Sequence, residues 1–289
     1  MATEPRSLEE LQEIAKELRE DVVQMLVEAG SGHSAGPLGL ADFFAAFFFS
    51  QRRHKPNDPE WDGRDRFVLS AGHLAPILYA ALSRSGYFPL EELKTLRKLG
   101  TRLQGHPHPY SDGGPPGVEF GCASLGQGVG AAVGMAYAAR MDQKTHMTYC
   151  LGGDGEMNEG SIWEALMFAG KERLFNFCYV IDRNNIQIDG HTEEVMPLEP
   201  LRDKLEAFGF YVKDVDGHNI REVIASLEEA RAIYEKPMAI ILHTIPGKGV
   251  DFIEYKPEWH GKPPNKEEAE DALSQIRSLE GRISCVDCE

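Results

Sequence analysis

Basic residues are scarce in this sequence relative to acidic ones. The 289-residue chain has 30 lysines and arginines against 46 aspartates and glutamates, which gives a formal net charge of −16 at pH 7. Such a charge argues against nucleic acid or an anionic membrane as the main partner. It does not exclude an anionic cofactor, because a metal ion and helix termini can supply positive potential locally.

Cysteine and long apolar runs are also sparse. The chain has 5 cysteines, and three of them stand inside apolar segments, which is typical of reduced core residues rather than of a disulfide framework: Cys122, Cys150 and Cys178. The charged N-terminus lacks the apolar region of a secretory signal, and the longest apolar run, Phe43–Phe49, is too short to span a bilayer. We therefore expect a soluble cytoplasmic protein that does not bind membranes.

What the chain does contain is a regular alternation of short apolar strands and amphipathic helices. The predicted strands are 66–70, 146–151, 177–181, 211–215 and 238–244, and the predicted helices include 7–30, 74–83, 89–99, 158–171, 198–208, 220–234 and 266–280. This alternation indicates an α/β fold with a doubly wound, mostly parallel sheet and helices on both faces. We expect one domain over residues 1–265, followed over 266–289 by a C-terminal helix and an exposed tail that holds Cys285 and Cys288.

Two further predicted helices differ from ordinary surface helices. The segment 38–49 is almost wholly apolar, which predicts a helix that is either buried on all sides or packed at a subunit interface. The segment 126–139 is rich in glycine and alanine, and its small residues permit close approach of a neighbouring helix or subunit. Both segments are therefore candidate interface surfaces.

Polar residues follow two of the predicted strands. Asp154 comes after strand 146–151 and stands between Gly153 and Gly155, which let the backbone turn sharply and come close to a ligand. Asn184 lies thirty positions further on, after the next strand. That spacing is one strand–helix–strand unit, so both residues should lie at the same edge of neighbouring parallel strands. A carboxylate, a carboxamide oxygen and a backbone carbonyl form an oxygen-only set that suits Mg²⁺ or Ca²⁺, with phosphate oxygens completing the shell.

This pattern resembles the Gly-Asp-Gly…Asn-Asn signature of thiamine diphosphate enzymes, and the flanking residues are similar to the N-terminal half of transketolase. In that family the aspartate, the asparagine and the carbonyl two residues further on hold the metal that bridges the diphosphate. The corresponding residues here are Asp154, Asn184 and Ile186. The resemblance therefore implies thiamine diphosphate with Mg²⁺ or Ca²⁺ as cofactors, Gly153 and Gly155 beside the cofactor, and the thiamine diphosphate-binding fold of the diphosphate (PP) domain.

Four histidines stand in loops that carry further family-like motifs. His33 lies in Ser-Gly-His before Gly-Pro-Leu-Gly, His73 in Phe-Val-Leu-Ser-Ala-Gly-His, His106 in Gly-His-Pro and His260 in Trp-His-Gly. Without the resemblance, each would be interpreted as an ordinary surface or core histidine. The resemblance implies that His33 and His106 hydrogen-bond the developing alkoxide and the donor hydroxyls. It also implies that His73 and His260 hold the diphosphate and assist proton transfer, and that His106 contacts the cofactor.

The run Cys122-Ala-Ser-Leu-Gly-Gln-Gly resembles the family's Thr-Gly-Ser-Leu-Gly-Gln-Gly. The resemblance assigns Leu125 to cofactor binding. Ala123 stands where the family usually has glycine, which leaves open whether the backbone contact to the thiamine ring is kept there. Two other histidines are less informative: His108 has no family counterpart and is expected at the surface, and His218 is compatible with a structural or a functional role.

Full transketolases continue into a pyrimidine-binding domain, whose glutamate activates the aminopyrimidine of the cofactor. Glu156 follows Asp154 too closely to replace that glutamate, and Glu159 and Glu164 resemble the acidic residues of the family's subunit contact. The resemblance thus implies the N-terminal subunit of a split transketolase. Together with a separate C-terminal subunit, in an α2β2 assembly, it would transfer a two-carbon ketol unit from a ketose phosphate to an aldose phosphate.

Three alternatives remain open at this point. Another thiamine enzyme, such as deoxyxylulose-phosphate synthase or the α subunit of a 2-oxo acid dehydrogenase, would keep Asp154 and Asn184 without needing the four histidines. A non-catalytic Mg-diphosphate-binding module and a purely structural domain are the others. The sequence selects neither the ketose and aldose nor Mg²⁺ over Ca²⁺.

Overall fold

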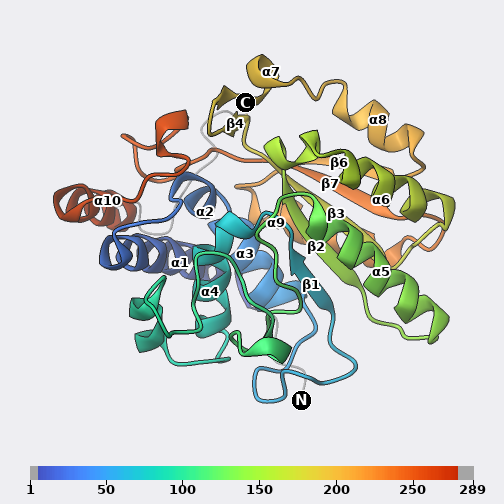
Figure 1. Ribbon diagram of the computed structural model, residues 1–289, viewed down its shortest axis with the longest axis horizontal. Helices are drawn as coiled ribbons and strands as arrows, with labels where there is room; N and C mark the ends of the chain where they lie inside the picture. The colour runs from blue at the N-terminus through green and yellow to red at the C-terminus, as the bar shows by residue number, and fades with distance from the viewer. Residues whose placement is uncertain (1–5, 279–289) are drawn as a thin grey trace.

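A five-stranded parallel sheet forms the centre of the computed structural model, which describes residues 6–278 (Figure 1). The strands lie in the order β1 (Arg66–Leu69), β2 (Thr148–Gly153), β3 (Phe177–Arg183), β7 (Met238–His243) and β6 (Tyr211–Asp216). Every neighbouring pair is parallel. The predicted doubly wound α/β fold is therefore confirmed, with its five strands at the predicted places.

Helices cover both faces of this sheet and create two apolar cores. One core contains α1 (Leu8–Ala29), α2 (Ala35–Gly39), α3 (Ala41–Ala46), α4 (Ala75–Arg84), α9 (Ile220–Ala232) and α10 (Lys266–Ser278). The other contains α5 (Gln127–Met141), α6 (Gly160–Lys171) and α8 (Leu201–Ala207). Successive residues of a strand point to opposite faces, so Cys178 and Val180 of β3 join the first core while Tyr179 and Ile181 join the second.

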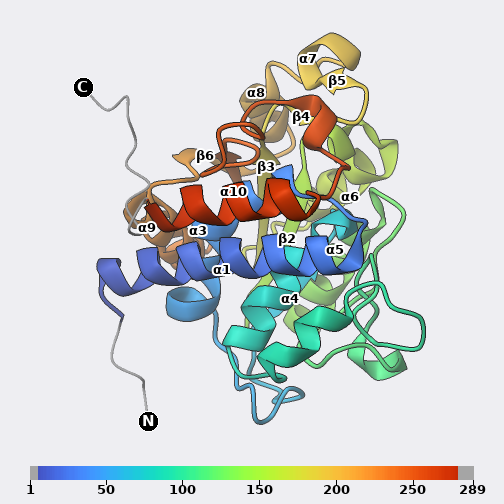
Figure 2. The ribbon, with the colours of Figure 1, turned by 90° about the vertical axis from the view of Figure 1, so that its left-hand side faces the viewer.

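The first helix begins as its sequence predicts. Ser7 and Glu10 form a complete capping box, in which each side chain accepts a hydrogen bond from the other residue's backbone N–H. The helix ends at Gly30, whose φ of 62° is the left-handed conformation that glycine adopts without a steric penalty. α10 lies alongside α1 (Figure 2) and buries Ala269, Ala272 and Ile276 against the same core.

Two predicted helices are wrong in part. The apolar segment 38–49 is divided among α2, α3 and a π-helical turn at Phe47–Gln51, and its phenylalanines pack against β1 inside this chain. That burial excludes it as a subunit interface, whereas the alternative of a helix buried on all sides is confirmed. The segment 89–99 forms only a 3₁₀ turn at Leu90–Thr95, because Arg97 adopts a φ of 58° and its N–H donates to the carbonyl of Leu103 instead of continuing a helix.

Two features complete the description of the fold. A short antiparallel hairpin that we did not predict, β4 (Ile186–Gln187) with β5 (Gly190–His191), follows β3 and brings a new wall to the edge of the sheet. Within residues 6–278, no helix has the length and apolarity needed to cross a bilayer. The tail with Cys285 and Cys288 lies outside the described residues.

Candidate active site

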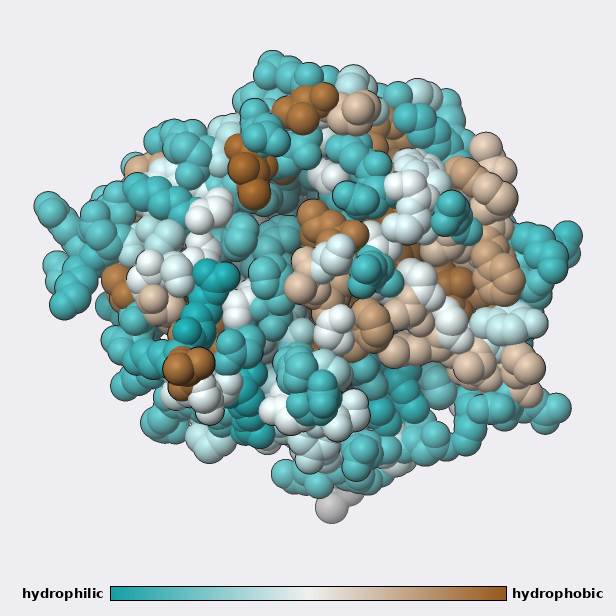
Figure 3. Space-filling model, viewed as in Figure 1, coloured by the Kyte–Doolittle hydropathy of each residue, from teal (hydrophilic) through white to brown (hydrophobic). Residues whose placement is uncertain are grey.

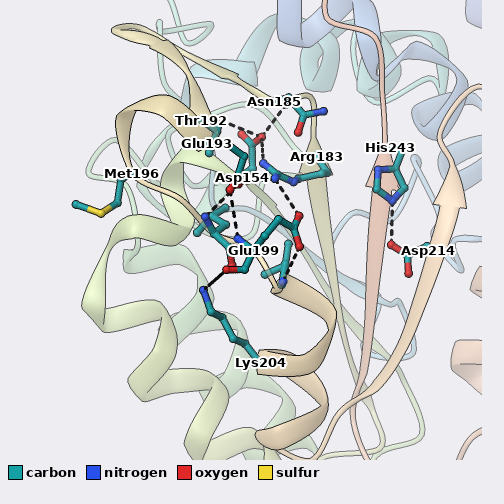
Figure 4. A network of polar contacts seen from close by, with 12 residues as sticks. Asp154, Arg183, Asn185, Thr192, Glu193, Met196, Glu199, Lys204, Asp214 and His243 are labelled. Atoms are coloured by element: carbon teal, nitrogen blue, oxygen red, sulfur yellow. Dashed lines mark hydrogen bonds and ion pairs between the residues drawn. The ribbon is translucent and has the colours of Figure 1, made fainter.

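Asp154 follows β2 directly and is nearly enclosed, with 2% of its surface exposed. The Gly155 N–H donates to Asp154 Oδ1 at 2.7 Å. Asp154 Oδ2 accepts hydrogen bonds from the Asn185 N–H at 2.8 Å and the Thr192 hydroxyl at 3.2 Å, and Arg183 Nη1 lies 3.1 Å away (Figure 4). Burial raises the pKa of the Asp154 carboxyl, and Arg183 opposes this rise. Both carboxylate oxygens are thus held in fixed positions at the edge of the sheet.

Arg183 was not among the predicted site residues. Its guanidinium is almost fully buried and, besides Asp154, contacts Glu193 at 2.6 Å and Glu199 at 3.0 Å (Figure 4). Glu193 lies on α7 (Thr192–Val195), so Arg183 connects the segment after the hairpin to Asp154. The only signal in the sequence is an arginine at the end of an otherwise apolar strand.

Asn184 is oriented by Asp182, a second residue that the sequence analysis missed. Asn184 Nδ2 donates to Asp182 Oδ2 at 2.7 Å, and the Ile186 N–H donates to Asn184 Oδ1 at 3.0 Å. The other oxygen of Asp182 accepts a hydrogen bond from the Thr244 hydroxyl. Burial raises the pKa of the Asp182 carboxyl to about 7. An ionised carboxylate only accepts hydrogen bonds, so it holds the nitrogen of the Asn184 amide toward itself and turns the oxygen away.

We expect Asp182→Asn to weaken the binding of Mg²⁺ about tenfold, as is typical when the partner that orients a metal ligand is lost. Two amides can pair in either sense, so Asn184 would no longer be restricted to presenting its oxygen. Thr244→Val, which leaves the Asp182–Asn184 hydrogen bond in place, is the matched control. Calorimetric titration of Mg²⁺ above pH 7, with thiamine diphosphate present, measures the effect; equal affinities for Asp182→Asn and the wild type would contradict this interpretation of Asp182.

Three histidines from distant segments meet next to this edge. The ring centroids of His33 and His73 are 4.9 Å apart, those of His73 and His260 are 5.2 Å apart, and those of His33 and His260 are 5.6 Å apart. His33 follows α1, His73 stands in the turn after β1, and His260 follows the 3₁₀ turn Pro257–Trp259. The fold therefore places side chains from the start, the middle and the end of the chain in one cluster.

His106 joins the cluster through a close approach of two loops. A Cβ atom at Gly72 would lie 1.7 Å from the Cys122 carbonyl oxygen and 3.4 Å from the His106 ring. Only glycine therefore allows the turn before His73 to pack against the loops that carry His106 and Cys122.

Burial lowers the pKa of every histidine in this group. The pKa of His33 falls to about 4, with neighbouring His260 adding to the effect, and the pKa of His73 lies well below its usual value. Burial lowers the pKa values of His106 and His260 as well. All four rings are thus neutral near pH 7, and each then has one donor and one acceptor nitrogen, as proton exchange with sugar hydroxyls requires.

The lowered pKa of His33 predicts that folding stability falls in acid. The unfolded chain takes up a proton at His33 near pH 6.5 and the folded chain only near pH 4. The stabilisation is therefore complete above pH 6.5 and is lost as the pH falls toward 4. We expect His33→Asn to reduce the loss of Tm between neutral pH and pH 5 by about 2 °C, measured by calorimetry. His54, whose burial lowers its pKa to about 4 far along the chain beside Tyr87, remains in both proteins, so equal losses would contradict the prediction.

One cavity of about 430 Å³ brings all ten predicted site residues together. Its lining includes His33, His73, His106, Leu125, Gly153, Asp154, Gly155, Asn184, Ile186 and His260. It extends from the histidines to the carboxyl ends of β2 and β3, where open α/β sheets place their ligands. The two other histidines lie elsewhere: His108 is exposed beside Asp112, and His218 is structural, because its ring nitrogens contact Asp42 and the Ile245 N–H.

The charge of the cavity indicates which ligands it can hold. Its described lining contains four carboxylates and neither lysine nor arginine: Asp154, Glu156, Asp182 and Asp189. A diphosphate would be repelled by this lining unless a cation accompanied it. Asp154 Oδ1 and Asn184 Oδ1 each accept one hydrogen bond among those described, which leaves each a lone pair for a cation.

The donor atoms therefore fit a hard divalent ion. Among residues 6–278, no group of three or more histidine, cysteine, aspartate or glutamate side chains could hold a metal ion. A metal at this edge would accordingly need amide and carbonyl oxygens, which Asn184 and Ile186 can supply beside Asp154.

The fold and the cavity together define a parallel α/β domain whose ligand site, at the ends of two adjacent strands, suits a metal-bound diphosphate. The chain belongs to the transketolase family: the family described as "Transketolase, thiamine diphosphate binding domain" matches residues 10–278. The transketolase of Campylobacter jejuni has a similar structure, with a TM-score of 0.89 and 38% identity over 94% of this chain and 43% of that one.

The curated relatives are of two lengths. The 6-deoxy-6-sulfo-D-fructose transketolase subunit SqwG of Clostridium sp. (strain MSTE9) is 43% identical, over 92% of this chain and 96% of its own. A subunit of the apulose-4-phosphate transketolase of Phocaeicola vulgatus is 39% identical, over 89% of this chain and 90% of its own. The transketolase of Rattus norvegicus is 39% identical over 94% of this chain, which spans only 43% of that protein.

Proposed function

We propose that this chain is the N-terminal, thiamine diphosphate-binding subunit of a split transketolase. It would transfer a two-carbon ketol unit from a ketose phosphate to an aldose phosphate, together with a separate C-terminal subunit that carries the pyrimidine-binding domain. The observation that carries the proposal is the single cavity that holds the ten residues with family-like motifs. Two relatives named as transketolase subunits that match this chain over nearly their whole length support the separate partner.

In this proposal, Asp154, Asn184 and the Ile186 carbonyl hold Mg²⁺ or Ca²⁺, and the backbone at Gly153 and Gly155 borders the diphosphate. When bound, thiamine diphosphate supplies the electron sink for breaking and forming the carbon–carbon bond. The protein's part is to bind, to orient and to move protons. The negative lining makes cofactor binding depend on the divalent ion, because no described lysine or arginine of the cavity can neutralise the diphosphate.

The four histidines carry the proton chemistry in this proposal. His33 and His106 hydrogen-bond the donor hydroxyls and the developing alkoxide, and His73 and His260 border the diphosphate and assist proton transfer. The enclosed position of His73 and the low pKa of His33 keep these rings neutral, so each can donate at one nitrogen while accepting at the other.

We propose that the assembly is an α2β2 heterotetramer and that α5 and α6 contribute to self-association. These helices carry exposed Met141, Met167 and Phe168, and apolar side chains gather over this part of the surface (Figure 3). Gly130 and Gly134 of α5 have open space where a Cβ would stand, so another backbone can approach closely. The reduced, buried Cys122, Cys150 and Cys178 agree with a cytoplasmic location.

The test is a turnover assay in which the full chain and its partner are given two donors in turn. A ketose phosphate should support turnover with thiamine diphosphate and Mg²⁺, and pyruvate should not. Turnover of pyruvate alone would instead indicate a deoxyxylulose-phosphate synthase or a 2-oxo acid dehydrogenase. Calorimetric binding of thiamine diphosphate without turnover of either donor would indicate a non-catalytic module.

A further inference from the structure

Glu156 is a buried carboxylate in the wall of the cavity that the proposed chemistry does not use. It stands in the 3₁₀ turn after Asp154 and is 2% exposed. Its Oε1 accepts hydrogen bonds from the Ser70 hydroxyl and, at 2.8 Å, from the Gly126 N–H. Its Oε2 accepts a hydrogen bond from the Gly153 N–H at 3.2 Å. One side chain therefore connects the ends of β1 and β2 to the loop before α5.

That loop forms part of the cavity. Ala123 and Leu125 both line it, and Leu125 is 37% exposed, so this side chain is available to a ligand. Gly126 closes the loop with a φ of 87°, in the left-handed region. Its carbonyl accepts a hydrogen bond from Ser161 at 3.3 Å, so both polar backbone groups of Gly126 are attached to the segment that follows β2.

The packing around Gly126 leaves little space for the loop to move. A Cβ at Gly128 would lie 2.6 Å from Ser70, and a Cβ at Gly126 would lie 2.7 Å from the Ser161 hydroxyl. The loop thus approaches its neighbours closely. Glu156 supplies the acceptors at this junction, where the N–H of Gly126 would otherwise be buried without a partner.

We propose that Glu156 is a positioning residue that fixes the Leu125 wall relative to the metal-binding edge, and so sets the affinity for the thiamine part of the cofactor rather than for its diphosphate. This inference rests on the proposed function, in which Leu125 contacts thiamine. Glu156 itself touches neither the reacting atoms nor the metal. Its effect on binding passes through the Gly126 N–H and the loop that begins at Cys122.

Glu156→Gln tests this because the substitution keeps the shape and removes one acceptor. In either orientation of the new amide, its NH₂ group opposes a backbone N–H, of Gly126 or of Gly153. We expect the affinity for thiamine diphosphate, measured calorimetrically with Mg²⁺ in the complex of the full chain with its partner subunit, to fall about tenfold. The affinity for inorganic pyrophosphate with Mg²⁺ should stay within about twofold, because pyrophosphate lacks the thiamine that meets the loop.

Glu91→Gln, an exposed carboxylate outside the cavity lining, is the control and should leave both affinities unchanged. Ser70→Ala removes one hydrogen bond to the same oxygen and should produce a smaller loss with the same selectivity, which keeps the test decisive if Glu156→Gln does not fold. Unchanged binding of thiamine diphosphate, or an equal loss for both ligands, would overturn the inference. If the wild type bound neither ligand, the proposed function would fail; if it bound both and the variants lost no selectivity, only the role of Glu156 would fail.

Discussion

Asp154→Asn should lower the affinity for thiamine diphosphate with Mg²⁺ at least about 100-fold. The substitution removes the only negative charge of the proposed ligand set and leaves an amide that can present its nitrogen to the cation. The fold should persist, because Arg183 keeps its contacts with Glu193 and Glu199. Calorimetry of the cofactor at fixed Mg²⁺ measures the loss, and a thermal melt confirms that the variant is folded.

Asp189→Asn is the matched control for this experiment. Asp189 also lines the cavity, but it is exposed and lies in the hairpin rather than at a strand end. If the metal is held by Asp154, this control should bind the cofactor within about twofold of the wild type. Equal losses for Asp154→Asn and Asp189→Asn would mean that the net charge of the cavity, and not a ligand at Asp154, governs binding.

Ketol transfer should require the second chain, with an increase of at least about 100-fold when it is added, as is typical of a general acid–base group. The three buried carboxylates of the cavity are already committed: Asp154 to Arg183, Asp182 to Asn184, and Glu156 to the Gly126 N–H. None is available to activate the aminopyrimidine. The measurement is the rate with a ketose phosphate donor at increasing ratios of partner to chain.

The rate should saturate at equimolar partner. A wild-type chain that catalysed full ketol transfer by itself would contradict the split arrangement. A partner variant without its activating glutamate separates the two contributions of the second chain, since it should still assemble but should not restore turnover.

The alternation of strands and helices and the site at the ends of β2 and β3 followed from the sequence, because periodicity and strand order are local signals. The Gly-Asp-Gly turn and Asn184 follow the apolar strands that position them, so their meeting could be predicted from spacing alone. The convergence of His33 with His260 could not, since it depends on how α1 and the segment after β7 pack. The resemblance to transketolase supplied that part.

The missed residues share a physical reason. Asp182 and Arg183 stand at the end of an apolar strand, and their roles depend on side-chain partners that no periodicity reveals. Glu156 likewise has the sequence context of a turn before a helix, whereas its side chain bends back to Gly126. The error at 38–49 is different: complete burial and an apolar interface have the same composition, and only the packing of Phe44 and Phe47 against β1 distinguishes them.

The most direct test of the metal-binding edge is a crystal of the complex grown with thiamine diphosphate and Ca²⁺. The account predicts a calcium ion bound between β2 and β3, with the oxygens of Asp154, Asn184 and Ile186 about 2.3–2.6 Å from it and diphosphate oxygens completing the shell. A cofactor bound in the cavity with its cation on the histidines, or with no cation at that edge, would contradict it.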